Sequence, residues 1–278
     1  METTTARSGQ AAIRTDTPMK QVGARPDLKP RSEMLPTLIV SAAIIAAIQV
    51  ASWFVPPFVV PSPAVIVQAA YEILTAEASH IGITALRLLA AVLFSMATGV
   101  MIGIVMGTRP RVRPFLRALV IIDTGIPALS WMLLAIFWFR DPEMRIFFIL
   151  SVILIPFYAL NVYDGIRALP KEWVDMIESF RPDRWQVLRY LIVPHIVPYI
   201  FLTTKSVIGY AMRMAIFAEL VASAVGIGSR MSFAQSTFRI DQIFAWTLLL
   251  VVFNLALQAG VTMLERAMLK WRPEATVR

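Results

Sequence analysis

The 278-residue sequence contains no cysteine and only 2 histidines. The absence of thiols excludes disulfides, cysteine metal sites and thiolate chemistry. His80 and His195 lie far apart and have no carboxylate cluster beside them, so we expect both to be structural and predict no metal site and no catalytic residue. The sequence also lacks the GxxxxGK loop followed by Ser or Thr that cradles nucleotide phosphates. We therefore expect no ATP hydrolysis by this chain and no bound cofactor.

Charged residues are also scarce, at 16% of the chain, whereas 58% of the residues are hydrophobic. Such a chain is too apolar for a soluble domain. Apolar runs of about 18 to 25 residues, the length that crosses a hydrocarbon core, occur at 35–54, 83–107, 115–139, 146–163, 196–223 and 242–264. These runs predict an all-α integral membrane protein with about six transmembrane helices.

The two ends of the chain are polar and show no apolar periodicity. We expect residues 1–33 to form a disordered cytoplasmic tail without a cleavable signal peptide. Residues 34–272 are the predicted transmembrane domain, with a cytoplasmic loop at about 165–194, and residues 273–278 are a cytoplasmic carboxyl-terminal tail.

The formal net charge is +8, and its distribution indicates topology. Lys and Arg concentrate in residues 1–33, 109–117, 167–189 and 266–278, whereas the alternate loops hold only Arg140, Arg145, Arg230 and Arg239. By the positive-inside rule, this asymmetry predicts that both termini are cytoplasmic. Because topology accounts for the basic residues, we expect membrane lipid and no nucleic acid as a partner.

The loop between the fourth and fifth apolar runs contains a short amphipathic pattern. An apolar face forms where residues recur at i, i+3, i+4 and i+7, which is the spacing of Trp173, Met176, Ile177 and Phe180. Pro170 suits the first turn of this helix, and Pro182 ends it after Arg181. Asp183 is placed to cap a second helix that leads back toward the membrane. We expect the amphipathic helix to dock onto a soluble protein, or alternatively to lie on the membrane surface.

The fifth apolar run carries three ionisable residues, Lys205, Arg213 and Glu219, together with Thr203 and Tyr210. A charge at the bilayer centre costs about 2.5–3.5 kcal/mol on insertion scales. The polar side of this helix should therefore face the bundle interior or a water-filled cavity, and it is a candidate solute path. Lys205 and Glu219 lie about 21 Å apart along a helix axis, so each needs its own partner. The alternative is that Lys205 and Arg213 snorkel or neutralise other groups while the path lies elsewhere.

The second apolar run has glycine at every fourth position, at Gly99, Gly103 and Gly107. A stripe of small residues lets two helices approach closely in lipid, where packing drives association. We therefore predict a tight helix–helix seam along this stripe. The aromatic residues of the third run are expected to serve packing.

The spacing of the loop motif matches a known family. Permease subunits of ABC importers carry Glu-Ala-Ala, three residues, Gly, nine residues and then Ile-x-Leu-Pro. This spacing falls on Asp175-Met176-Ile177, Arg181, Leu191 and Val193-Pro194. The adjoining Arg184-Trp185-Gln186 and the segments 60–63, 127–131, 218–219 and 226–228 also look like this family. The chain resembles the permease subunit of a bacterial ABC importer, in the nitrate, sulfonate and taurine branch.

The resemblance implies a type I importer permease fold in the bacterial inner membrane. It also implies a separate cytoplasmic ABC ATPase, a periplasmic or lipid-anchored solute-binding protein, and a permease homodimer as the working unit. ATPase docking would involve Trp173, Asp175, Met176, Ile177, Phe180, Arg181, Trp185, Leu191 and Pro194. The solute would be a small anion such as a sulfonate, taurine or nitrate. A thiamine precursor or another vitamin-like solute, and an ion-gradient-driven carrier, are the alternatives.

The sequence departs from the family pattern inside the loop. Asp175 replaces the family's glutamate, Met176 and Ile177 replace the two alanines, and Arg181 replaces the glycine. Glycine permits positive φ between two helices, whereas a residue before proline is pushed toward extended geometry. We therefore expect the turn at Arg181 to be extended and built differently from that of the family.

Overall fold

The computed structural model describes residues 34–269, and these residues are helical with no β-strand among them. The predicted tails at 1–33 and 273–278, and residues 270–272 of the predicted transmembrane domain, lie outside the described part. The chain divides into two units, residues 1–44 and 45–278. Helix α1 (Met34–Phe54) runs across this boundary, and the rest of the description concerns the second unit.

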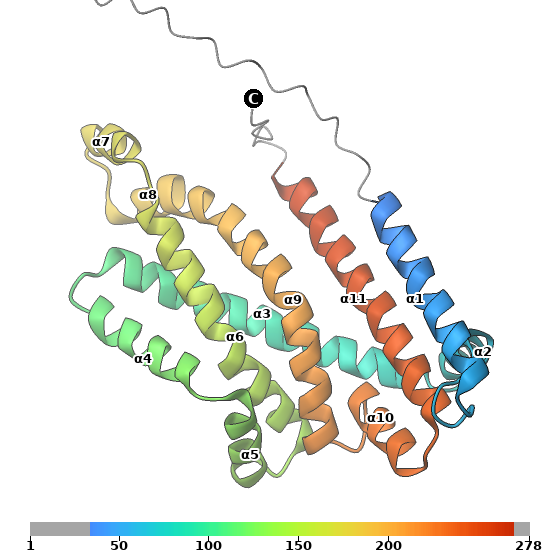
Figure 1. Ribbon diagram of the computed structural model, residues 1–278. Coiled ribbons are helices and arrows are strands. Elements are labelled where there is room, and N and C mark those ends of the chain that lie inside the picture. Colours follow the sequence, from blue (N-terminus) through green and yellow to red (C-terminus); the bar gives the residue numbers. More distant parts are fainter. Residues whose placement is uncertain (1–33, 270–278) are drawn as a thin grey trace, which may run out of the picture. The chain divides into compact units, whose positions relative to one another are not determined.

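Eleven further helical segments follow α1 along the chain (Figure 1): α2 (Pro63–Ala76), α3 (Ala78–Thr108), α4 (Arg113–Gly125), α5 (Ala128–Trp138), α6 (Pro142–Arg167), α7 (Lys171–Ser179), α8 (Arg184–Val187), the π-helical turn η1 (Leu188–Ile192), α9 (Val193–Ala222), α10 (Ile227–Ser236) and α11 (Ile240–Met268). Within residues 34–269, 5 helical runs are long and apolar enough to cross a membrane, or 6 if α4 and α5 together form one span. The number of predicted spans is thus confirmed.

The apolar run at 115–139 is divided into two helices, which together can form one bent span. Helices α4 and α5 meet at an angle of 95°. Pro127 has no N–H and restricts the residue before it, and Ile126 accordingly adopts an extended conformation with φ −85° and ψ 124°. Helix α4 ends at Gly125, and Pro127 is the N-cap residue of α5.

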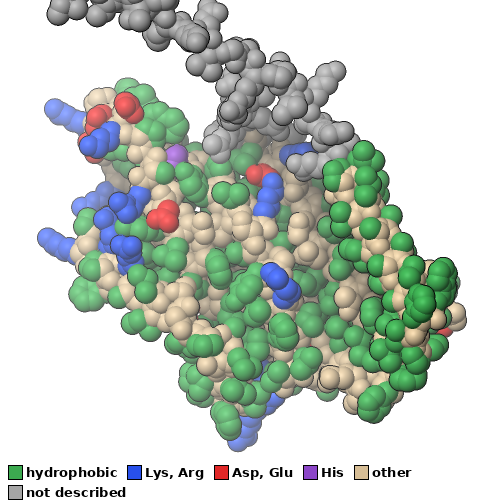
Figure 2. Space-filling model, viewed as in Figure 1, with side chains coloured by type: hydrophobic (Ala, Val, Ile, Leu, Met, Phe, Trp, Pro, Cys, Tyr) green, Lys and Arg blue, Asp and Glu red, His purple; other side chains and the backbone are tan. Residues whose placement is uncertain are grey.

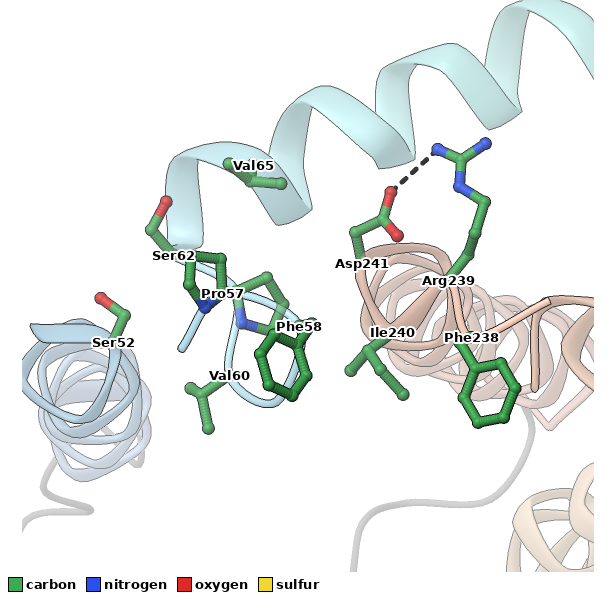
Figure 3. A pocket seen from close by; sticks show the side chains of 11 residues that line it. Ser52, Pro57, Phe58, Val60, Ser62, Val65, Phe238, Arg239, Ile240 and Asp241 are labelled. Atoms are coloured by element: carbon green, nitrogen blue, oxygen red, sulfur yellow. Dashed lines mark hydrogen bonds and ion pairs between the residues drawn. The ribbon is translucent and has the colours of Figure 1, made fainter. Parts of the chain in front are cut away.

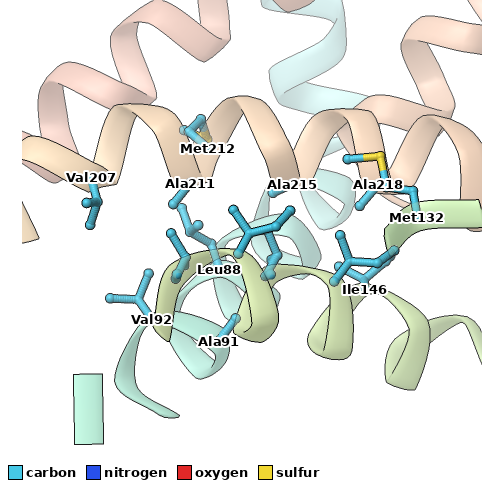
Figure 4. Packing of buried hydrophobic residues seen from close by; sticks show 14 of the residues in the cluster. Leu88, Ala91, Val92, Met132, Ile146, Val207, Ala211, Met212, Ala215 and Ala218 are labelled. Carbon is cyan, nitrogen blue, oxygen red and sulfur yellow. The ribbon is translucent and has the colours of Figure 1, made fainter. Parts of the chain in front are cut away.

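Helices α3, α6 and α9 form the centre of the second unit. Figure 4 shows Leu88 and Ala91 of α3, Ile146 of α6 and Ala211 and Ala215 of α9 meeting in one cluster, all of them buried. Large and small side chains alternate in this cluster, so the three helices can pack closely. In lipid such packing is driven by van der Waals contact and not by the hydrophobic effect. This packed centre fixes the positions of both candidate functional regions.

The predicted glycine seam is the contact between α3 and α6. A Cβ added at Gly103 would lie 2.8 Å from Val162 Cβ and 2.8 Å from the Ala159 carbonyl oxygen, and one added at Gly107 would lie 2.7 Å from Ile166. Such distances are shorter than van der Waals contact, so only glycine allows this approach. The interpretation as a close helix–helix seam is confirmed.

Helices α8, η1 and α9 form one helical run of 39 residues, Arg184–Ala222. Pro194 and Pro198 lie near the membrane-entering part of this run. Proline cannot donate the backbone hydrogen bond to the preceding turn, and local π-helical geometry is a common adjustment to an interrupted ladder. The π-helical turn directly before Pro194 therefore keeps the run continuous through its two prolines.

Candidate functional site: the α7 loop and the polar residues of α9

Helix α7 presents an apolar face to solvent. Trp173, Met176 and Phe180 are 49%, 61% and 80% exposed, and no residue of α7 is buried. Ile177 is half-buried, and Asp175 is exposed beside this face. The predicted amphipathic helix is therefore present, and the side chains of Met176 and Phe180 are largely uncovered, whereas Trp173 is about half covered. An exposed cluster of aromatic and aliphatic side chains is the usual composition of a protein-binding surface.

The base of the α7 loop is anchored to the bundle through His195. The rings of Trp173 and His195 meet edge to face at 5.9 Å, and the rings of His195 and Tyr199 lie 5.6 Å apart. His195 Nε2 lies 3.1 Å from the Gly165 carbonyl oxygen. These contacts attach α7 to the ends of α6 and α9, and they give His195 the structural role that was expected.

Asp183 caps the second helix of the loop. The Gln186 N–H donates to the Asp183 carboxylate at 2.7 Å, and the Asp183 N–H donates to the Gln186 side chain at 2.9 Å. This reciprocal capping box satisfies backbone donors that the helix start leaves open. Trp185 follows the cap and is 65% exposed. The predicted cap at Asp183 is therefore present in the structure.

Two of the motif residues do not lie on the outer surface. Leu191 is 9% exposed and belongs to η1, and Pro194 is half-buried at the start of α9. Both lie where the loop joins the bundle. Their place in the motif is best explained by the return of the chain into the membrane, so contact with a docking partner falls mainly to α7.

The expectation of an extended Arg181 was wrong. Arg181 has φ 49°, in the left-handed region, and Pro182 follows it. The backbone therefore adopts the conformation that the family's glycine permits, despite the cost of about 1–2 kcal/mol for an L side chain. Hydrogen bonds hold it there, because the Arg181 N–H donates to the Glu178 carbonyl at 2.9 Å and Asp183 begins the capped helix two residues later.

Replacing Arg181 with glycine is expected to be neutral or to stabilise the protein by up to about 1 kcal/mol, because relief of the left-handed strain exceeds the added chain entropy. Thermal unfolding of the detergent-solubilised protein measures this difference. Arg184→Gly, inside the first turn of α8, is the matched control and should destabilise by about 0.5–1 kcal/mol. Equal destabilisation by both variants would show that the positive φ is not strained.

Basic side chains gather at the end of the second unit where α7 and the α3–α4 turn lie (Figure 2). Two arginines there also have structural contacts. Arg113 Nε donates to the Met106 carbonyl at 2.9 Å, near the end of α3. The guanidinium groups of Arg113 and Arg167 lie 5.7 and 5.8 Å from the centre of the Tyr163 ring. The loop charges predicted from the sequence therefore share one end of the bundle with α7.

At the other end of α9, Glu219 is fully buried and fully hydrogen-bonded. Its carboxylate accepts from Thr84 Oγ1 at 2.7 Å, from Arg87 Nη1 at 2.8 Å and from the Gly228 N–H at 2.9 Å. A buried carboxylate is tolerated when it is paired with a cation and its oxygens are satisfied. Glu219 therefore joins α3, α9 and α10 through its carboxylate.

Arg87 extends this network to α6. It pairs with Glu143 as well as Glu219, and its Nη1 donates to the Val225 carbonyl at 2.7 Å. The sequence interpretation missed Arg87, Thr84 and Glu143 as partners of Glu219. A signal was available, because Arg87 is a lone charge inside the second apolar run and needed a buried counter-ion as much as Glu219 did.

Gly226 allows the loop after α9 to cover the Glu219 carboxylate. Its φ is 117°, and a Cβ at this position would clash with the Glu219 side chain. The Gly226 N–H donates to His80 Nδ1 at 3.1 Å, so His80 also has a structural role. Close by, Arg230 Nε donates to Glu77 at 2.8 Å, and this hydrogen bond holds the pKa of the Glu77 carboxyl below its ordinary value.

The remaining candidate path residues separate into three environments. Lys205 forms an ion pair with Glu265 of α11, as its distance from Glu219 required. Thr203 is buried and donates to the Tyr199 carbonyl at 2.7 Å. Tyr210 lies at a small cavity of about 90 Å³ at the α4–α5 break, which is also lined by Asp123, Thr124, Ile126, Ala128, Trp131, Ile153, Pro156 and Phe157.

Arg213 differs from these residues because it is exposed and unneutralised. Its Nε donates to the Gly209 carbonyl at 3.2 Å, one turn earlier in α9. Across residues 34–269, no ion pair includes Arg213. The structure therefore leaves the guanidinium of this intramembrane arginine open to its surroundings.

A larger hollow of about 400 Å³ lies between the segment after α1 and the start of α11. Figure 3 shows Pro57, Phe58 and Val65 facing Phe238 and Ile240 across it. Its charged pair, Arg239 and Asp241, is internally neutralised at 2.9 Å. The described residues contain no group of three or more potential metal ligands here or elsewhere. The hollow therefore carries no recognisable catalytic arrangement.

The chain is similar to known transport proteins. The profile of the family described as binding-protein-dependent transport system inner membrane component matches residues 99–270. An aliphatic sulfonates transport permease protein, SsuC of Bacillus subtilis (strain 168), is 29% identical over 84% of this chain and 87% of its own length. The taurine transport system permease protein TauC of Escherichia coli (strain K12) is 23% identical over 70% of this chain and 71% of its own length.

Solved structures show the same fold. A chain of the MetNI methionine ABC transporter in an inward-facing conformation aligns with a TM-score of 0.62 at 16% identity, over 70% of this chain and 97% of that chain. This likeness confirms the type I importer permease fold. The helix order, the family match and the relatives agree, and the chain belongs to the binding-protein-dependent transport system inner membrane component family as a multi-pass ABC importer permease subunit.

Proposed function

We propose that this permease imports a small anionic solute, such as a sulfonate or taurine, and is driven by a separate cytoplasmic ABC ATPase that docks on α7. The observation that carries the proposal is the open apolar face of Trp173, Met176 and Phe180 on a helix with no buried residue. The relatives named for taurine and aliphatic sulfonates support the solute class.

The docking surface consists of the α7 face and its edge. The exposed apolar side chains fill a groove on the ATPase, Asp175 meets a basic residue there, and Arg181 and Trp185 border the contact. Ile177, Leu191 and Pro194 hold the loop in place on the bundle. Because apolar anchors in a desolvated pocket dominate interface energies, most of the affinity comes from Trp173, Met176 and Phe180.

The wider assembly follows from the same proposal. A periplasmic or lipid-anchored binding protein delivers the solute, and two copies of this permease form the path in the bacterial inner membrane. Arg109 and Arg113 lie in the α3–α4 turn, and Arg167 ends α6 shortly before α7. The gathering of basic side chains at this end of the bundle (Figure 2) supports a cytoplasmic location for it. Both termini are then cytoplasmic, at the side where ATP is available.

The Met176→Ser/Phe180→Ser double variant is expected to reduce the co-purifying ATPase at least tenfold. Loss of two exposed apolar anchors removes binding energy, whereas the permease itself loses little because both side chains are 61% or more exposed. The measurement is the ATPase-to-permease ratio after affinity purification of the co-expressed, full-length subunits.

The matched control is Lys171→Ser/Glu172→Ser, which alters two exposed residues on the polar side of the same helix. This control should retain the ATPase. Undiminished ATPase with the apolar double variant would show that α7 is not the docking element. Reconstitution with and without the ATPase separates the importer from an ion-gradient-driven carrier, because only the carrier transports alone.

A further inference from the structure

The basic side chains in the middle of the spanning helices of the second unit differ in whether they have a carboxylate partner. Arg87, Lys205 and Arg213 each lie more than two helical turns from both ends of their spanning helices. Arg87 pairs with Glu143 and Glu219, and Lys205 pairs with Glu265. Among these three residues only Arg213 has no carboxylate partner in the described part of the chain.

The position of Arg213 makes this lack of a partner costly in lipid. An arginine at membrane depth normally faces a water-filled cavity, pairs with another group, or reaches the interface by snorkelling. Nine residues of α9 follow Arg213 before the helix ends at Ala222, a rise of about 13 Å. This distance exceeds the reach of the side chain, which is moreover turned back by its hydrogen bond to the Gly209 carbonyl.

The neighbours of Arg213 on α9 make the same face polar. Ser206 is exposed, and a Cβ on the half-buried Gly209 would lie 3.5 Å from Asn254 and 3.9 Å from Gln258 of α11. At 100° per residue, Ser206, Gly209 and Arg213 fall within a sector of about 60° on the helix. The sector thus combines an exposed hydroxyl, a glycine beside polar side chains of α11, and a guanidinium without a carboxylate partner in the middle of the span.

We infer that Arg213 is the anion-recognition residue of the solute path, and that the Ser206–Gly209–Arg213 face of α9 lines that path. This inference rests on the proposed import function and adds the residue that distinguishes anionic solutes from other solutes. A guanidinium offers several N–H donors in one plane and binds oxyanions such as sulfonate or carboxylate through paired, charge-assisted hydrogen bonds. The Nε bond to Gly209 leaves both terminal nitrogens of Arg213 for such a ligand.

The absence of native cysteine permits a direct test with the full-length permease in membrane vesicles. The Ser206→Cys variant is labelled with two water-soluble probes, the anionic sulfonatoethyl methanethiosulfonate and the cationic trimethylammonioethyl methanethiosulfonate. Ser206 and Arg213 are separated by about 10 Å along the helix. One charge at that distance changes the anion-to-cation rate ratio about fourfold even with the dielectric screening of water.

The expected result is labelling of the Ser206→Cys variant by both probes and a fall of about fourfold or more in the anion-to-cation ratio when Arg213→Gln is added. Arg184→Gln, which removes an exposed arginine of the cytoplasmic loop, is the matched control and should leave the ratio unchanged. Failure of both probes to label the introduced thiol would place this face in lipid and overturn the inference. An unchanged ratio with Arg213→Gln would overturn it equally.

This labelling requires neither an ATPase nor the physiological solute. Its outcome is therefore independent of the co-purification test of α7. Loss of ATPase binding with normal labelling would leave Arg213 as an anion site, whereas normal ATPase binding with failed labelling would reject Arg213 and retain the importer.

Discussion

Glu219→Ala is expected to destabilise the permease by about 3–5 kcal/mol, the usual cost of removing one partner of a buried ion pair. The variant leaves Arg87 with only Glu143, and it leaves Thr84 and the Gly228 N–H without their acceptor. Three helices would lose their common attachment. The measurement is the fraction of monodisperse protein that survives heating in detergent.

A matched control is available in the pair between Lys205 and Glu265. Both side chains are partly exposed, so Glu265→Ala should cost no more than about 1 kcal/mol. The Arg87→Met/Glu219→Met double variant should recover part of the lost stability, because it removes both buried charges together. Equal losses for Glu219→Ala and Glu265→Ala would show that burial does not distinguish the two pairs.

Gly103→Leu is expected to separate α3 from α6 and to cost more than the roughly 1–3 kcal/mol typical of overpacked cores. Even the first added carbon would lie 2.8 Å from Val162 and from the Ala159 carbonyl. Backbone on the facing helix cannot move aside as a flexible side chain can. Thermal stability and the yield of folded permease are the measurements.

The same helix provides the control for this prediction. A Cβ at Gly82 would meet no atom within 4 Å, so Gly82→Ala should stabilise α3 by about 0.5–1 kcal/mol. Gly103→Ala combined with Val162→Ala should be better tolerated than Gly103→Ala alone. If Gly82→Ala and Gly103→Ala have the same effect, the close seam is not what requires glycine.

The sequence predicted those features that depend on one helix at a time. The lengths of the apolar runs predicted the spans, and the glycine spacing predicted a close helix contact along α3. The i, i+3, i+4, i+7 pattern predicted the apolar face of α7. The family match and the solved structures confirm the permease fold. The docking and path residues stay predictions, because their roles depend on contacts with other molecules.

The sequence interpretation failed where geometry depends on several segments together. It did not identify the partner of Glu219, because the charge on α9 was considered without Arg87, which lies 132 residues away. It expected Arg181 to be extended because the rule for residues before proline was applied without the capped helix that follows. It did not separate α4 from α5, because the hydropathy of a run of residues does not show where the helix axis bends.

The uninterrupted helical run from Arg184 to Ala222 has a mechanical consequence. One end adjoins the α7 loop and the other carries Glu219, with no loop between them. If α7 docks an ATPase as proposed, a displacement of the α7 loop would pass along this run to the region of Glu219 through continuous helix. The π-helical turn η1 lies between the α7 loop and α9, so a change in its stiffness is expected to change how such a displacement reaches α9.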